Sequence, residues 1–246
     1  MNKKLIGLVV KTAAGLLVAA AATAGFVIWR TSGKVEIKFD IHINSEAIYF
    51  STYAEPPQFA IWLENPESGE LRQVFVTYRA ARGDWEGKSD VPVAVPHWTM
   101  LFRDRGDEKV DGVSGATPKK ESFVVQVEVS PGSEWICWLE MNLAGDYNEY
   151  YPQFNRVTLQ EDEFSCGQPA LLYRADIKAE RGNGYTPQLA YMSIWDNGTN
   201  SLAPVDSTIT TAQNVFDTIY ISIVKPKPRI FKKSIKQQED VLNEIK

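Results

Sequence analysis

A short run of small and polar residues, 111–117, is the first stretch of this sequence that could do chemistry. It reads Asp-Gly-Val-Ser-Gly-Ala-Thr and is followed by Pro118. Glycine, serine, threonine and proline this close together predict a tight, non-helical turn whose backbone N–H groups can bind a ligand. The alternative is a turn that only positions the strand after it. The candidates for binding a ligand or a partner are Asp111, Ser114, Gly115 and Thr117.

A second polar run, 146–151, mixes an aspartate, an asparagine and a glutamate with three tyrosines. Aspartate and asparagine side chains often cap backbone groups in turns, which gives this run a purely structural interpretation. The other interpretation is a polar patch with an aromatic surface that binds a partner. The candidates here are Asp146, Asn148 and Tyr150.

Familiar catalytic and metal-binding patterns are missing from the sequence. It contains no G-x-S-x-G, H-E-x-x-H, P-loop or dinucleotide-binding motif. The two histidines, His42 and His97, lie in separate contexts, and we predict no metal site. A calcium loop built from Asp104, Asp107 and Asp111 would match no standard spacing, and basic residues between them oppose a cation.

The two cysteines, Cys137 and Cys166, are too few for a disulfide scaffold. An oxidising compartment would permit one bridge between them. Cys137 falls in a predicted strand and Cys166 in a predicted loop. A disulfide between the two therefore remains open.

Alternating apolar and polar residues predict the elements that position these candidates. In 35–43, five apolar residues alternate with four polar ones, which is typical of a strand in an antiparallel sheet with one wet face. Further strands are predicted at 59–64, 71–79, 123–129, 135–143, 171–179, 188–195 and 219–223. Residues 80–110 are predicted to be irregular. Strands in this number, without helical periodicity, predict an all-β fold, an immunoglobulin-like antiparallel β-sandwich.

The N-terminal segment predicts a membrane anchor. Residues 5–29 are apolar except for Lys11, and the uninterrupted part, 12–29, would form roughly 27 Å of helix. Lysines before it favour a cytoplasmic N-terminus. A cleaved signal peptide ending near Ala24 is the alternative, although the apolar run continues past that site. We expect a single-pass inner-membrane protein, held by residues 5–29, with its globular domain in the periplasm or extracytoplasmic space.

The expected domain organisation is an anchor and linker over 1–34, a β-sandwich over 35–228 and a helical tail over 229–246. In the tail, apolar residues recur every three or four positions, which predicts one narrow apolar stripe on a helix. The tail residues predicted to dock a partner are Phe231, Ile235, Leu242 and Ile245. A frayed tail, or a helix packed on its own domain, is the alternative.

The composition argues against one class of partner. The 246 residues carry a formal net charge of −5, whereas a nucleic-acid-binding surface must be basic. With 44% hydrophobic residues, the chain can bury a sizeable core. The expected partners are therefore the membrane and another protein subunit, not nucleic acid.

Several of these stretches resemble one family. Residues 111–117, together with 59–65 upstream and 140–151 downstream, are similar to the predicted periplasmic proteins of domain-of-unknown-function family 2271. The likeness covers roughly Phe59 to Tyr151 and extends to 168–173. It implies an extracytoplasmic β-sandwich. Genes of this family often lie beside those of PepSY-type membrane proteins and flavin-transferase systems, which implies a role near membrane electron transfer. It implies no established catalytic activity.

Residues 114–117, Ser-Gly-Ala-Thr, are also similar to the motif of covalent flavin carriers. In those proteins a serine or threonine two places after the threonine forms the phosphoester with flavin mononucleotide. Lys119 occupies that position here, and an ammonium group cannot form the ester. We therefore expect no cofactor.

The leading functional hypothesis is a non-catalytic accessory subunit of a membrane complex, and the family resemblance implies that this is a redox complex. One alternative is a periplasmic protein that binds a flavin or another small ligand through 111–117. A second alternative is a hydrolase of surface polymers.

Overall fold

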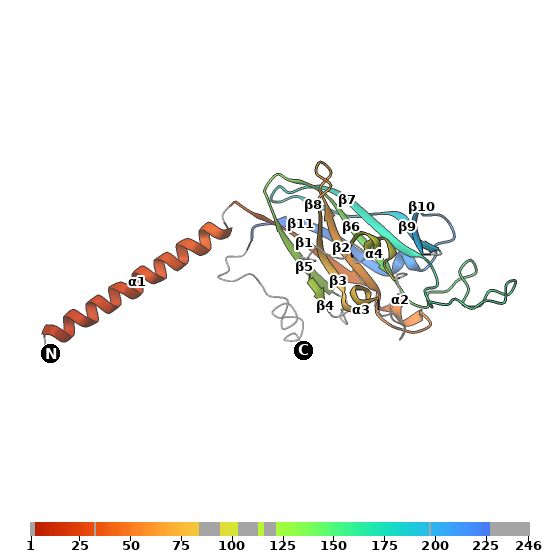
Figure 1. Ribbon diagram of the computed structural model, residues 1–246, viewed down its shortest axis with the longest axis horizontal. Coiled ribbons are helices and arrows are strands. Elements are labelled where there is room, and N and C mark those ends of the chain that lie inside the picture. Colours follow the sequence, from red (N-terminus) through yellow and green to blue (C-terminus); the bar gives the residue numbers. More distant parts are fainter. Residues whose placement is uncertain are drawn as a thin grey trace.

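The computed structural model describes residues 3–31, 33–83, 94–102, 113–115, 122–196 and 198–226. It consists of one long N-terminal helix and a β-sandwich of two sheets (Figure 1). The predicted antiparallel sandwich is therefore confirmed. The C-terminal tail, with its predicted docking residues, lies outside the described residues and stays a prediction.

The smaller sheet has four strands in the order β5-β1-β11-β8. Their bounds are β5 Ser122–Val129, β1 Val35–Ile43, β11 Phe216–Val224 and β8 Gly184–Tyr185. All of its pairings are antiparallel, with Ile37 of β1 opposite Ile223 on one side and Phe39 opposite Val125 on the other. The apolar residues of β1 all face the second sheet, as the alternation predicts.

The larger sheet has seven strands in the order β10-β9-β7-β6-β2-β3-β4. Their bounds are β10 Thr199–Pro204, β9 Gln188–Asp196, β7 Ala170–Lys178, β6 Glu134–Asn142, β2 Gln58–Glu64, β3 Leu71–Thr77 and β4 Val113–Gly115. Every pairing in this sheet is antiparallel except that between β3 and β4, which is parallel.

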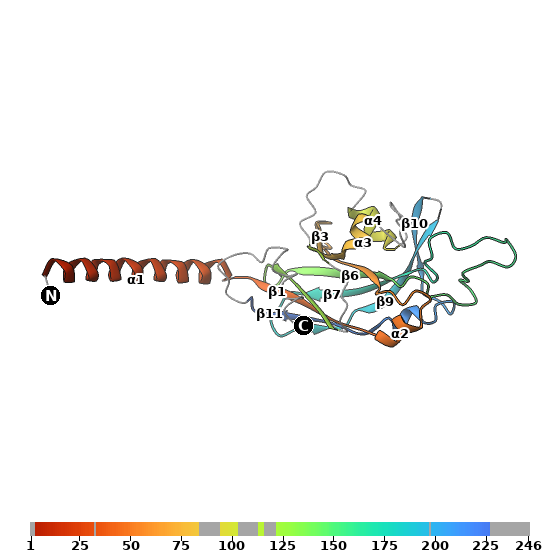
Figure 2. The same cartoon turned by 90° about the horizontal axis from the view of Figure 1, so that it is seen from below.

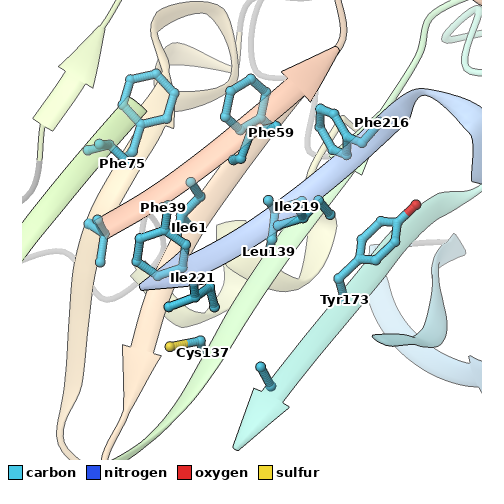
Figure 3. Close-up of a cluster of buried hydrophobic side chains, with 14 of the residues drawn as sticks. Phe39, Phe59, Ile61, Phe75, Cys137, Leu139, Tyr173, Phe216, Ile219 and Ile221 are labelled. Carbon is cyan, nitrogen blue, oxygen red and sulfur yellow. The ribbon is translucent and has the colours of Figure 1, made fainter. Parts of the chain in front are cut away.

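The main core lies between the two sheets, which stack one above the other in the side view (Figure 2). Its centre is aromatic (Figure 3): the ring of Phe59 lies 5.2 Å from that of Phe75 and 5.7 Å from that of Phe216. The edge-to-face arrangement of Phe59 and Phe216 is one that aromatic pairs prefer. Leu139 and Ile221 pack beside these rings from opposite sheets.

A second apolar layer covers the outer face of the larger sheet. Trp62 of β2 is fully buried although its neighbours Ile61 and Leu63 point into the main core. Two short helices form the cover, α3 (Tyr78–Arg82) and α4 (Pro96–Phe102). Strand β2 is thus buried on both faces, which explains its continuous apolar sequence.

These helices correct the prediction that residues 80–110 are irregular and that the strand beginning at Leu71 continues to 79. The strand ends at Thr77, and α3 follows at once. Residues 79–82 are good helix formers, and Gly83 ends the helix with a positive φ of 67°. A third short helix, α2 (Ser45–Phe50), was also not predicted. Asn44 caps it through hydrogen bonds from two backbone N–H groups.

Helix α1 (Lys3–Thr31) extends away from the sandwich in both views (Figures 1 and 2). Its segment Thr12–Trp29 has a mean hydropathy of 1.8 and is only 6% buried in the protein. This helix is long and apolar enough to span a membrane, as the sequence predicts.

Candidate functional site

The predicted polar run 146–151 lies in the long connection between β6 and β7, residues 143–169. This connection and helix α2 occupy the end of the sandwich opposite α1, which we call the far end (Figure 1). The backbone N–H of Thr52, just after α2, donates to the carbonyl of Gly145 at 3.1 Å and ties the two segments together. Long ordered connections of this kind are frequently functional.

Asp146 is a buried structural residue. It is 7% exposed, and its carboxylate accepts hydrogen bonds from Gln168 Nε2 at 2.8 Å and from the hydroxyl of Thr211. Gln168 Oε1 in turn accepts from the backbone N–H of Thr210 at 2.7 Å. Burial raises the pKa of Asp146, and the Thr211 hydroxyl partly offsets this by lowering it. The carboxylate therefore joins two loops.

Asn148 has the same kind of role. Its amide nitrogen donates to the carbonyl of Thr208 at 2.8 Å, and its oxygen accepts from the backbone N–H groups of Tyr150 and Tyr151. This arrangement matches the structural interpretation of the run, in which aspartate and asparagine cap a turn. The side chain of Tyr150, however, is 53% exposed, so it remains open to a partner.

Beyond these tyrosines the connection forms a small hairpin with an apolar tip. Phe154 pairs with Glu161, and Asn155 closes the turn by donating its backbone N–H to the carbonyl of Gln160 at 2.8 Å. At the tip, Val157 is 91% exposed and Leu159 is 72% exposed. Leu159 also has a φ of +58°, which is unusual for a bulky residue and costs about 1–3 kcal/mol.

Helix α2 contributes two more exposed aromatic residues to the far end. Tyr49 and Phe50 are each 75% exposed, and their rings contact each other edge to face at 5.5 Å. Between α2 and the connection lies a shallow depression of about 350 Å³, lined by residues that include Phe50, Tyr147 and Asp146. The far end thus presents apolar side chains from two separate elements.

Part of the predicted turn 111–117 is a strand. Residues Val113–Gly115 form β4, an edge strand parallel to β3, in which Ser114 lies opposite Val76 and Gly115 opposite Thr77. This corrects the prediction of a turn, because the backbone of 113–115 pairs with a strand. Asp111, Thr117 and Lys119 lie outside the described residues.

The described members of the first predicted group, Ser114 and Gly115, are not brought together with those of the second group, Asp146, Asn148 and Tyr150. β4 and β6 are separated by β3 and β2 in the sheet, a lateral distance of roughly 14 Å. Ser114 and Asp146 therefore lie in different parts of the larger sheet and its connections. Neither of the two depressions in the described structure is lined by residues of both groups.

A buried polar cluster that the sequence did not predict lies beneath α4. Glu140 of β6 is fully buried, and its two oxygens accept the backbone N–H groups of His97 at 3.0 Å and Trp98 at 2.7 Å. These N–H groups belong to the first turn of α4, where helices favour a carboxylate. Burial raises the pKa of Glu140, whereas the hydrogen bonds from Ser193, Trp98 and His97 lower it.

The cluster continues from Ser193 to Asn200, whose amide nitrogen donates to the Ser193 hydroxyl at 2.9 Å. The side-chain oxygen of Asn200 in turn lies 3.0 Å from His97 Nδ1, within hydrogen-bond distance. The carboxylate of Glu140 is thus already occupied by helix and strand partners. The cluster holds α4 on the sheet. A sequence signal for it existed in the tryptophans on the outer face of β2 and β6, which indicate a covered face.

The two cysteines do not form a disulfide. Cys137 lies in the main core, and burial raises the pKa of its thiol well above the ordinary value. Cys166 is half-buried beside Ala144 at the far end. Since Cys137 lies opposite Leu63 in the middle of the sheet, strand geometry keeps the two sulfurs apart.

Within the described part of the chain, no three histidine, cysteine, aspartate or glutamate residues are grouped to hold a metal ion. Asp146 and Asn148 are engaged in internal hydrogen bonds. The exposed candidates are apolar or aromatic. Such side chains bind complementary apolar surfaces.

Comparison with models of known protein families, with curated proteins and with solved structures found no match for this chain. The resemblance to domain-of-unknown-function family 2271 therefore stays a prediction from the sequence.

Proposed function

We propose that this protein is a non-catalytic accessory subunit of a membrane complex, anchored by α1 and presenting the far end of its sandwich to a partner protein. The globular domain lies outside the cytoplasm, in the periplasm or its equivalent. The suggestion that the complex is a redox complex rests on the family resemblance alone.

The anchor is supported by the properties of α1. The apolar segment Thr12–Trp29 matches the thickness of the hydrocarbon layer and packs on almost nothing in the protein. An apolar helix of this length that stays exposed needs a lipid environment. Lys3, Lys4 and Lys11 precede or begin the segment, which favours an N-terminus on the cytoplasmic side and a sandwich on the other side.

The observation that carries the proposal is the set of exposed apolar residues at the far end. Its members are Tyr49, Phe50, Tyr150, Phe154, Val157 and Leu159, all at least half exposed. Isolated exposed apolar residues are ordinary, but two groups of them at one end, on α2 and on the connection 143–169, support an interaction surface there. The positive φ of Leu159 strengthens the argument, because an asparagine or glycine would be more stable there and more soluble.

The contacts of the polar candidates favour binding over catalysis. Asp146 lies next to the far end and Glu140 lies beneath α4, and both oxygens of each buried carboxylate accept hydrogen bonds from the protein. A general acid or base must reach a substrate proton, and these two carboxylates already hold loops and a helix in place. The alternatives of ligand binding and hydrolysis have less support.

The variant Leu159→Asn tests this proposal because it separates stability from binding. Asparagine tolerates a positive φ better than leucine, so we expect the free energy of unfolding to stay the same or rise by up to about 1 kcal/mol. Loss of the exposed apolar side chain should nevertheless weaken co-purification of the full-length protein with its complex in mild detergent. Adding Val157→Ser should weaken co-purification further.

Thr158→Ser is the matched control, since it changes an exposed residue of the same turn without removing a large apolar side chain. It should leave co-purification unchanged. Full recovery of every partner with the Leu159→Asn, Val157→Ser double variant would contradict the proposal.

A further inference from the structure

We propose that the end of the sandwich next to α1 binds the headgroups of anionic phospholipids through Lys34, Arg181 and Lys225. We call this end the near end. The inference rests on the proposed anchoring by α1, but it is independent of any partner at the far end.

The chain itself keeps the near end close to the membrane. The apolar segment of α1 ends at Trp29, and β1 begins at Val35. Six residues reach at most about 20 Å even when fully extended. The first residues of β1 and the segments beside them must therefore lie within reach of the lipid headgroups, whatever the tilt of α1.

Strand register determines which segments those are. Val35 pairs with Val129, so the turn after β5 lies beside the start of β1. Glu36 pairs with Val224, so β11 ends there as well. The backbone N–H of Gly182 donates to the carbonyl of Ile223 at 3.0 Å and brings the turn after β7 to the same place. Lys34, Arg181 and Lys225 are thus gathered by the fold.

A depression of about 650 Å³ opens at this end, lined in part by Ile28, Pro131 and the three basic residues. Ile28 belongs to the apolar segment of α1, so the depression has an apolar wall on the membrane side and cations on the sandwich side. A phospholipid offers the same two features, an apolar acyl region and an anionic phosphate. The chemistry of the lining therefore fits a lipid better than a fully polar ligand.

Two of the three cations have no carboxylate partner in the described structure. Lys34 pairs with Glu128 at 3.2 Å, whereas neither Arg181 nor Lys225 forms an ion pair with a described residue. Both are exposed. The neighbouring Glu180 is already paired with Lys178 at 2.6 Å. In a chain with a net charge of −5, two cations that form no ion pair with a described residue are available for headgroup phosphates.

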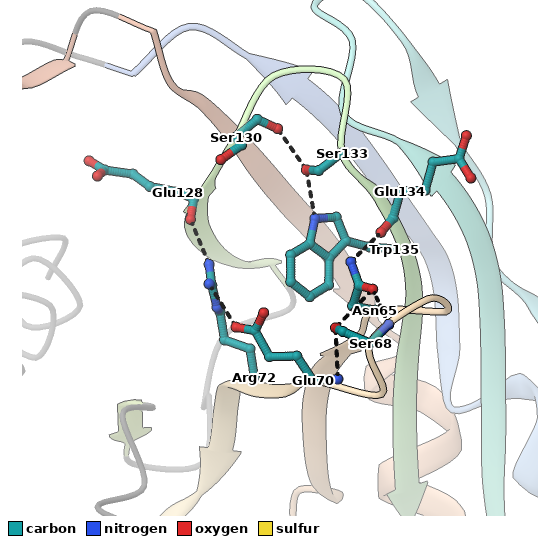
Figure 4. A network of polar contacts seen from close by, with 9 residues as sticks. All are labelled: Asn65, Ser68, Glu70, Arg72, Glu128, Ser130, Ser133, Glu134 and Trp135. Carbon is teal, nitrogen blue, oxygen red and sulfur yellow. Dashed lines mark hydrogen bonds and ion pairs between the residues drawn. The ribbon is translucent and has the colours of Figure 1, made fainter.

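The near end is also rigid, as a network of polar contacts shows (Figure 4). Arg72 donates to the carbonyl of Glu128 at 3.1 Å, pairs with Glu70 at 3.0 Å, and lies over the ring of Trp135 at 5.2 Å. Trp135 Nε1 donates to the Ser133 hydroxyl at 2.8 Å and so ties down the turn after β5. A surface fixed in this way loses little entropy when it meets a bilayer.

The test uses the full-length protein in nanodiscs of phosphatidylcholine alone or with phosphatidylglycerol, and follows hydrogen–deuterium exchange by mass spectrometry. We expect the backbone amides of 180–183 and of Val224 to exchange more slowly in the phosphatidylglycerol discs. The double variant Arg181→Glu, Lys225→Glu should lose this difference, since each cation near an anionic surface contributes roughly five-fold in affinity. Arg156→Glu, the same change at the far end, should keep it.

Equal exchange in both lipids, or a lipid effect that survives the double variant, would overturn the proposal. Inorganic phosphate added to phosphatidylcholine discs separates a lipid headgroup from a soluble anion. Protection by phosphate alone would show a soluble-anion site and overturn the assignment to lipid. Failure of the protein to elute with the nanodiscs would instead disprove the anchoring, and with it this inference, while leaving the far end untouched.

Discussion

At the scale of single residues, two buried carboxylates organise the sandwich. Glu140 accepts hydrogen bonds from the backbone N–H groups in the first turn of α4. Asp146 accepts one from the Thr211 hydroxyl and so joins the connection 143–169 to the loop that contains Thr211. Burial raises the pKa of both. Their hydrogen bonds make them structural residues, although Asp146 was a candidate for binding.

The raised pKa of Asp146 predicts a pH-dependent contribution to stability. A carboxyl group whose pKa is higher in the folded than in the unfolded chain holds its proton more tightly when folded. Its contribution is therefore complete below the unfolded value of about 3.9 and is lost as the pH rises through the folded value. The difference in unfolding free energy between the wild type and Asp146→Asn should shrink as the pH rises from about 4. Urea unfolding at a series of pH values measures it, and a difference that grows with pH would be contrary to the assignment.

The cysteines give a second prediction at this scale. Burial and the nearby charge of Asp176 raise the pKa of the Cys137 thiol, so its reactive thiolate is rare and inaccessible. The half-buried Cys166 lies in a loop. We expect iodoacetamide at about pH 8 to modify Cys166 in the folded protein and Cys137 only after unfolding, as read by peptide mass spectrometry. Recovery of a peptide linked through both cysteines would refute the structure at this point.

At the scale of elements, the sequence predicts most of the strands but not the short helices that pack on them. The alternation of β1 and the apolar run of β2 predicted both strands within one residue of their observed bounds. The helices α2, α3 and α4 have only five to seven residues, too few for a helical period to show in the sequence. Local capping residues, Asn44 and Gly83, were the available signals.

The candidate site was predicted in part for the same reason. For the run 146–151 the sequence leaves two interpretations open, and the capped turn is one of them because aspartate and asparagine act on neighbouring backbone groups. The hairpin with Val157 and Leu159 was not recognised, since nothing in its sequence says that these apolar residues stay outside the core. Glu140 was missed because its partner is a helix N-terminus more than forty positions away in the chain.

The connection 143–169 depends on one close approach of two backbone segments. Gly167 has a φ of +70°, and a Cβ atom there would lie 2.5 Å from the carbonyl oxygen of Asp146. Gly167→Ala should therefore lower the free energy of unfolding by more than about 2 kcal/mol. The alanine would be strained at this positive φ, and the backbone at Asp146 would also have to move. Gly198→Ala is the control. Its φ of +86° is also unfavourable for alanine, but no neighbouring atom lies within 4 Å of the added Cβ.

Only the conformational strain applies to the control, so Gly198→Ala should cost about 1 kcal/mol. Urea unfolding of both variants gives the comparison. Equal losses for the two would mean that the approach of Gly167 to Asp146 is not required by the fold.

At the scale of the whole molecule, the two ends of the sandwich have different chemistry. The near end follows α1 by a few residues and gathers basic side chains. The far end presents exposed aromatic and aliphatic residues. This polarity along one axis is what a subunit needs if it is held by a membrane at one end and binds a partner with the other.

The most direct test of this account is photo-cross-linking in intact membranes of cells that contain the complex. A photoreactive phenylalanine derivative replaces Val157 at the far end or, as the control, the exposed Thr186 in the connection after β8. We predict one defined cross-linked protein from position 157, none from position 186, and loss of the product when Leu159→Asn is added. The absence of a product from position 157, the same products from both positions, or a product that is indifferent to Leu159→Asn would contradict the proposed partner surface.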